Sequence, residues 1–153
     1  MDQLLCLLIY MITALSGLQA RLPVPLRGSF ERWEKGKKIK LLLAGCNGAR
    51  NTGSDVRTAE IARQAREAFG KENVQITVMA LDLPSLEGYF GPDVILLPFS
   101  SLFPLDLWRA CSSHHAAILC EGSALKSTFA AGLTLFLCQA AGIMGAQGKP
   151  CLA

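Results

Sequence analysis

Hydrophobic and polar positions alternate in blocks along this chain, and the blocks predict a repeating strand–helix order. Short apolar runs, typical of buried parallel strands, cover residues 39–44, 74–81, 94–97 and 116–120. Helical patterns cover residues 55–69, 105–112 and 124–146. The expected fold class is therefore α/β: a Rossmann-like parallel sheet with helices on both faces, spanning residues 38–153. Residues 151–153 resemble the start of a fifth strand, so we expect a truncated or fragmentary chain.

The segment 124–146 has two interpretations. It carries no charge between Thr128 and Gly148, so its hydropathy alone would allow a transmembrane helix. It lies inside the strand–helix alternation, however, and it contains Gln139 and Gly142. A helix buried between a sheet and its neighbours is also apolar on nearly all sides. The buried helix is the favoured interpretation.

The N-terminal 20 residues predict a hydrophobic helix. Leu4–Leu18 is an apolar stretch of 15 residues without charge, shorter than the about 20 that cross a bilayer. Residues 21–37 read as a basic linker broken by Pro23 and Pro25. Positive charge that follows a hydrophobic segment favours cytoplasmic retention and contact with anionic lipid through residues 4–40. We expect an uncleaved helix that projects from the domain or lies on its surface, joined by a poorly packed linker. A cleaved signal peptide and a helix packed on its own protein are the alternatives.

Composition narrows the function classes. The chain has 153 residues, is 51% hydrophobic and carries a net charge of only +3, without a basic stripe interleaved with aromatic residues. Nucleic acid is therefore not an expected partner. The six cysteines form no C-x-x-C pair and are expected to be reduced and buried. His114 and His115 lack metal-ligand spacing, so no metal is expected, and a solvated helix end is their favoured setting.

The main candidate for chemistry is the loop 45–55, with the sequence GCNGARNTGSD, between the first strand and its helix. Its glycines permit positive φ and close approach of a ligand, and the helix after it offers unpaired N–H groups to an anion. No Gly-Lys-Ser/Thr closes the loop, so it is not a P-loop. A purely structural turn is an equal alternative. Ser54 or Asp55 is expected to cap the helix, and Asp55 suits a ligand hydroxyl better than a phosphate.

This loop, followed by Val56 and Arg57, resembles the N-terminal motif of the polysaccharide pyruvyl transferase family. A second turn after the strand 116–120, with the sequence EGSALKS over 121–127, lies where that family places a glycine-rich turn. The resemblance covers residues 38–153. It implies the N-terminal half of a GT-B-like fold and transfer of a pyruvyl group from phosphoenolpyruvate to a sugar of a cell-surface polysaccharide. No further cofactor is implied.

Both turns follow parallel strands, so their residues should face each other across one crevice. The expected substrate-binding residues are Gly48, Arg50, Asn51, Gly53, Asp55, Arg57, Gly122, Ser123 and Lys126. Glu121 is the candidate general base, because a carboxylate can deprotonate an attacking hydroxyl. Its alternative is a loop carboxylate bonded to nearby backbone N–H groups. Where many family members have consecutive glycines, this chain has Cys120-Glu121-Gly122.

Other functions remain open on the sequence. A GT-B glycosyltransferase that uses a nucleotide-sugar would need the same crevice. A membrane-associated remnant that binds sugar without chemistry would need only part of it. The expected location is cytoplasmic, at the inner face of the membrane through the N-terminal helix, and a chain of this length alone is expected to be inactive.

Overall fold

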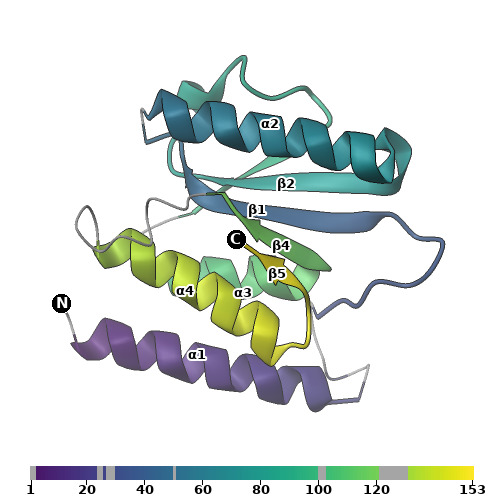
Figure 1. Ribbon diagram of the computed structural model, residues 1–153. Coiled ribbons are helices and arrows are strands. Elements are labelled where there is room, and N and C mark those ends of the chain that lie inside the picture. Colours follow the sequence, from purple (N-terminus) through teal and green to yellow (C-terminus); the bar gives the residue numbers. More distant parts are fainter. Residues whose placement is uncertain (1–2, 24–25, 27–29, 50, 100–102, 121–130) are drawn as a thin grey trace.

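The strands of this chain form one parallel sheet in the order β3-β2-β1-β4-β5 (Figure 1). A computed structural model describes residues 3–23, 26, 30–49, 51–99, 103–120 and 131–153. The strands are β1 (Ile39–Asn47), β2 (Val74–Ala80), β3 (Val94–Pro98), β4 (Ala116–Leu119) and β5 (Cys151–Leu152). All four pairings are parallel. The predicted α/β, Rossmann-like sheet is confirmed.

Helices cover both faces of the sheet, as predicted. The α-helices are α1 (Gln3–Arg21), α2 (Thr52–Phe69), α3 (Phe103–Ser113) and α4 (Ala131–Ala146), and short 3-10 turns lie at Lys71–Asn73 and Pro84–Leu86. In Figure 1, α2 lies on one face of the sheet and α3 and α4 lie on the other, with α1 as a further layer beneath them.

Successive side chains of β1 point to opposite faces of the sheet, and both faces are covered by helices. Leu41 and Leu43 pack with α2 residues, whereas Leu42 and Ala44 point to the opposite face. A strand buried on both sides must be apolar throughout, because successive side chains point in opposite directions. β1 therefore sits at the centre of the sheet, between β2 and β4.

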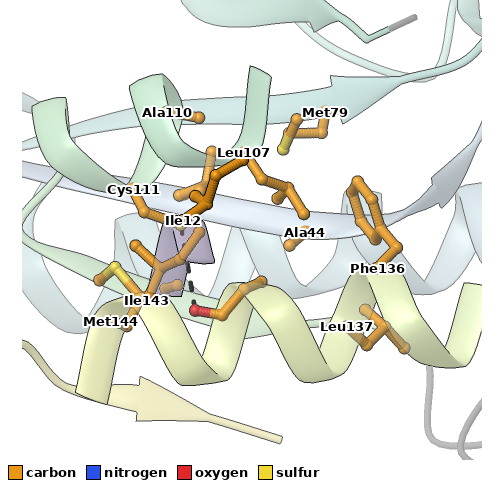
Figure 2. Packing of buried hydrophobic residues seen from close by; sticks show 13 residues of the cluster. Ile12, Ala44, Met79, Leu107, Ala110, Cys111, Phe136, Leu137, Ile143 and Met144 are labelled. Carbon is orange, nitrogen blue, oxygen red and sulfur yellow. Dashed lines mark hydrogen bonds between the residues drawn. The ribbon is translucent and has the colours of Figure 1, made fainter. Parts of the chain in front are cut away.

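Helix α4 is buried in the protein, which agrees with the favoured interpretation of its sequence. Phe136, Leu137 and Ile143 are at most 2% exposed and pack with Leu107 of α3 and Leu42 of β1. Figure 2 shows this cluster, in which the thiol of Cys111 lies 4.0 Å from a backbone oxygen of α4.

Helix α1 is the one described helix long and apolar enough to cross a membrane, by length and composition. Its inner side packs against α3 and α4, with Ile12 in the core cluster, so the alternative of a helix packed on its own protein describes this side, while the outer side lies on the surface. Its buried residues are Ile12, Ser16 and Ala20. The linker differs from the prediction, because Phe30 is 7% exposed and packs under a buried lysine, Lys149. The linker is thus attached to the domain at this point.

The cysteines divide into three groups, and the expectation that they are all buried is wrong. All six are free thiols. Cys111 and Cys120 are buried, Cys46 and Cys151 are half-buried, and Cys6 and Cys138 are exposed. The exposed pair lies on α1 and α4, whose outer surfaces are apolar, so a hydrophobic neighbourhood in sequence did not imply burial.

Candidate functional site

The candidate loop follows β1 at the point where the strand order changes direction. β1 pairs with β2 on one side and β4 on the other, and the chain reaches β4 only after β2 and β3. In open α/β sheets, ligands bind at such a point, outside the carboxyl ends of the strands. The N–H of Cys120 donates to the carbonyl of Ala44 at 2.9 Å, so the end of β4 lies beside the end of β1.

Part of the predicted site lies outside the described residues. This holds for Arg50 in the first turn and for Glu121, Gly122, Ser123 and Lys126 in the second. The predicted meeting of Asn51 and Asp55 with residues 121–126 therefore remains a prediction. The described contribution comes from the first turn and from α2.

Gly48 is held in place by the side chain of Asp55. Its backbone N–H donates to Oδ1 of Asp55 at 2.9 Å. Gly48 has φ +77°, and a Cβ at this position would lie 2.5 Å from the carbonyl oxygen of Asp82. No other residue type fits this conformation and this close backbone contact. The carboxylate of Asp55, 2% exposed, shapes the turn from inside.

A second contact ties the turn to the connection after β2. The hydroxyl of Ser85 lies 3.2 Å from the carbonyl of Gly48 and 2.9 Å from that of Asp82, and it can donate to either. The loop is therefore fixed from α2 on one side and from the residues after β2 on the other. A turn held in this way is preorganised for a ligand, as binding loops require.

The predicted helix cap is wrong. Helix α2 begins at Thr52, and Asn51 is its N-cap without a side-chain capping hydrogen bond. The N–H groups of Ser54 and Asp55 instead donate to the carbonyl of Asn51, at 2.9 and 3.2 Å. Ser54 and Asp55 are buried in the first turn, where Asp55 faces the loop at Gly48, whereas Asn51 and Gly53 are exposed. Thr52 at the start of the helix is exposed, as is Arg57 on the next turn.

Asn47 is a candidate residue that sequence reasoning missed. It is the last residue of β1, fully buried, and its Nδ2 donates to the carbonyl of Met79 at 3.0 Å. Within the described part of the chain, its Oδ1 has no hydrogen-bond partner. A buried amide oxygen without a donor is costly, so a ligand hydroxyl or a water would stabilise it. The available signal was a polar residue that ends an otherwise apolar strand.

The two histidines are buried at the opposite end of the sheet, where β1 and β4 begin. The expectation that they lie at a solvated helix end is wrong. His115 accepts a hydrogen bond at Nδ1 from the backbone N–H of Lys40, 3.0 Å away, and burial lowers its pKa. His114 Nδ1 lies 2.7 Å from the carbonyl of Ala110, and burial lowers the pKa of this histidine to about 4. The ring of His115 joins β4 to the start of β1, whereas the ring of His114 bonds within its own segment to the end of α3.

A buried cation completes this end of the sheet. The Nζ of Lys149 donates to the carbonyls of Cys111 and Ser112, at 2.7 and 2.8 Å, and lies 4.5 Å from the centre of the Phe30 ring. Burial lowers its pKa to about 8. A cation at the carboxyl end of α3 satisfies carbonyls that have no helical partner. Lys149 is therefore a structural residue.

A hollow of about 560 Å³ opens at the same end of the sheet, away from the candidate loop. It is lined by Phe30, Glu31, Arg32, Glu34, Lys37, Lys38, Lys40 and His115. Glu31 pairs with Lys40 at 2.5 Å, and Glu34 pairs with Lys37 at 2.8 Å. Because its own carboxylates already partner these lysines, the hollow is a weaker ligand site than the loop. In the described segments, no three His, Cys, Asp or Glu side chains gather in a way that could hold a metal ion.

The chain matches no protein-family model, no curated protein and no solved structure. The class that its architecture defines is therefore a Rossmann-like α/β domain with an added N-terminal apolar helix.

Proposed function

We propose that this chain is the N-terminal, substrate-binding half of a GT-B-like polysaccharide pyruvyl transferase. The main observation in support is that the preorganised Gly48 turn and the end of β4 lie side by side, where the strand order changes direction. This is where a Rossmann-like sheet receives an anionic or sugar ligand. The motif resemblance at 45–57 supports the identity of the donor, phosphoenolpyruvate, and the acceptor, a polysaccharide sugar.

The proposed transfer joins two sugar hydroxyl oxygens to C2 of phosphoenolpyruvate as a ketal. The C2–O bond to phosphate breaks, C3 gains one proton and becomes a methyl group, and inorganic phosphate leaves with the other proton. Asn51, Gly53 and Arg57 line one side of the proposed site, and Arg57 meets the phosphate or carboxylate as a charge-assisted partner. In the proposed reaction Glu121 removes a hydroxyl proton, and Gly122, Ser123 and Lys126 contribute to substrate binding; these four residues lie outside the described part of the chain.

The proposed location is the cytoplasmic face of a membrane, where residues 4–40 meet the lipid. Helix α1 supplies the apolar part of this segment, and seven cations against two carboxylates in residues 21–40 supply its charge. Anionic lipid attracts such a segment.

Calorimetric titration with phosphoenolpyruvate tests the proposed donor. We expect saturable binding that Arg57→Ala weakens and Arg63→Ala leaves unchanged, because Arg63 is exposed on the same helix but pairs with Glu60 and Glu67. Binding of a nucleotide-sugar in place of phosphoenolpyruvate would favour the glycosyltransferase alternative. The reaction needs the complete protein with both halves of the cleft: NMR of glycans incubated with that protein and phosphoenolpyruvate should show the ketal methyl group, whereas this chain alone should form none.

A further inference from the structure

The outward side of α1 is an exposed apolar face. It consists of Leu4, Leu7, Tyr10, Met11, Leu15 and Leu18, which are 50–75% exposed. We call this set the outer face of α1. Polar residues normally cover the solvent side of a helix that packs by one face, so an apolar outer face indicates a binding surface.

Helix α1 is also attached to the domain by specific contacts. The Oε1 of Gln19 lies 3.1 Å from Nε1 of Trp108 and 3.2 Å from the hydroxyl of Ser112, both on α3. Nε2 of Gln147 reaches the same oxygen at 3.4 Å. Removing α1 from the domain would deprive the half-buried Trp108 and the buried Ser112 and Gln147 of their common acceptor, at a cost in free energy.

Small residues bring α1 close to α4. A Cβ on Gly142 would lie 3.3 Å from the methyl group of Thr13, and a Cβ on Gly17 would lie 3.6 Å from that of Ala146. Glycine at a helix–helix contact permits this close approach. The inner side of α1 is therefore shaped for this domain, although the helix is about 28 Å long, close to the thickness of a bilayer core.

We propose that the outer face of α1 docks on an anionic lipid bilayer, with α1 lying in the plane of the membrane and still packed on α3 and α4. This inference deepens the proposed membrane location and does not depend on pyruvyl transfer. In this arrangement α1 is an interfacial helix and does not span the membrane: one of its sides contacts lipid and the other contacts protein.

Charge and shape favour lipid as the occupant. Helix α1 has no acidic residue in its first turn and has Arg21 in its last turn, where the basic segment begins. The N–H of Glu31 donates to the carbonyl of Ser112 at 2.8 Å, and the hydroxyl of Ser112 reaches Gln19, so the basic segment returns to the carboxyl end of α1. Cations at that end would meet anionic headgroups beside the buried apolar face.

An apolar groove beside the outer face supports the same occupant. It has a volume of about 320 Å³ and runs between Cys6, Tyr10 and Thr13 of α1 and Leu135, Cys138 and Gly142 of α4. Such a groove accepts hydrocarbon. A second copy of the chain would compete for the same face, and the experiment below distinguishes it from lipid.

Vesicle flotation of the full chain tests the docking. We expect binding to phosphatidylcholine vesicles that contain phosphatidylserine, and much weaker binding to phosphatidylcholine alone or at high salt. Met11→Gln with Leu15→Gln should reduce the bound fraction about tenfold, because both side chains lose favourable contact with lipid. Val56→Gln, at an equally exposed apolar position on α2, should leave it unchanged. Wild-type protein that stays unbound on anionic vesicles overturns the proposal, as does a dimer that the Met11/Leu15 variant abolishes.

A disulfide between α1 and α4 separates in-plane docking from spanning. Thr13→Cys with Gly142→Cys, in a background of Cys6→Ser and Cys138→Ser, places two thiols at the tight contact. If α1 stays on the domain, the oxidised and reduced forms bind vesicles equally. If only the reduced form binds, α1 leaves the domain to enter the membrane and the in-plane arrangement is wrong. Neither measurement uses phosphoenolpyruvate, so a failed transferase proposal would not affect the result.

Discussion

The carboxylate of Asp55 holds the backbone N–H of Gly48 at 2.9 Å, seven residues earlier in the chain. This contact links the first turn of α2 to the end of β1. It gives Asp55 a structural role that its motif position did not reveal. A substitution here therefore acts on the fold of the loop as well as on any ligand.

Asp55→Ala should lower the free energy of unfolding by about 2 kcal/mol, because a buried N–H loses its acceptor. Asp55→Asn retains an oxygen that can accept the same hydrogen bond, so its loss should be less than half as large. Urea unfolding of both variants measures the difference. Equal stability of wild type and Asp55→Ala would show that the contact contributes nothing.

Gly48→Ala should destabilise the protein by about 3 kcal/mol, because it combines a left-handed backbone with a backbone clash. Gly36 provides a matched control: it has φ +87°, but nothing lies within 4 Å of a Cβ there. Gly36→Ala should therefore cost only the conformational penalty, about 1 kcal/mol. Thermal unfolding of the two variants compares them, and similar losses would contradict the close approach at Gly48.

Gln19→Leu should lower stability by about 2 kcal/mol, because Trp108, Ser112 and Gln147 lose their shared acceptor. Gln3→Leu, at an exposed position on the same helix, is the control and should have little effect. Chemical denaturation gives the free energies, and hydrogen exchange along α1 shows whether the helix has detached. An unaltered Gln19→Leu variant would argue against specific docking of α1.

Acid should destabilise the protein through His114. Burial lowers the pKa of His114 from 6.5, the value in the unfolded chain, to about 4 in the folded chain. The unfolded state therefore binds more protons between these two pH values. The stability from the neutral ring is complete above pH 6.5 and is lost as the pH falls towards 4, by about 3 kcal/mol. Urea unfolding measured from about pH 7 down to about pH 4.5 should show no slope above pH 6.5 and the expected loss below it. His114→Gln should flatten this pH dependence.

Thiol reactivity should follow the three cysteine groups. Cys6 and Cys138 are exposed and should react with a thiol reagent in the native state, whereas Cys111 should react only on unfolding. Burial raises the pKa of the Cys111 thiol to about 12, so its thiolate is scarce as well as covered. Mass spectrometry of the modified peptides identifies the sites. Rapid native labelling of Cys111 would contradict the packing of α3 on α4.

The strands and most helices could be predicted because their signals are local. The apolar run Ile39–Ala44 marks β1, and Gly70 ends α2 as expected. Burial of polar residues could not be predicted in the same way. His115 is covered by the start of β1, and Phe30 is covered by Lys149, so both depend on partners far along the chain.

The candidate site shows the same division. The glycine loop was predictable, because it lies between a recognisable strand and helix. The contact of Asp55 with Gly48 and the burial of Asn47 against Met79 of β2 were not, because both depend on how the loop folds back on its neighbours. Patterns of residue type locate a turn, whereas tertiary contacts decide which of its side chains face a ligand.

The docking of α1 has to wait until nearly the whole chain has been synthesised. Gln19 leaves the ribosome early, but its partner Gln147 is separated from it by 128 positions. At common translation rates, α1 waits roughly 6 to 26 s for that residue to be made. During this interval the whole apolar helix, inner side included, is available to cellular factors that recognise nascent hydrophobic segments. The order of synthesis therefore leaves the inner side of α1 uncovered until α3 and α4 have been made.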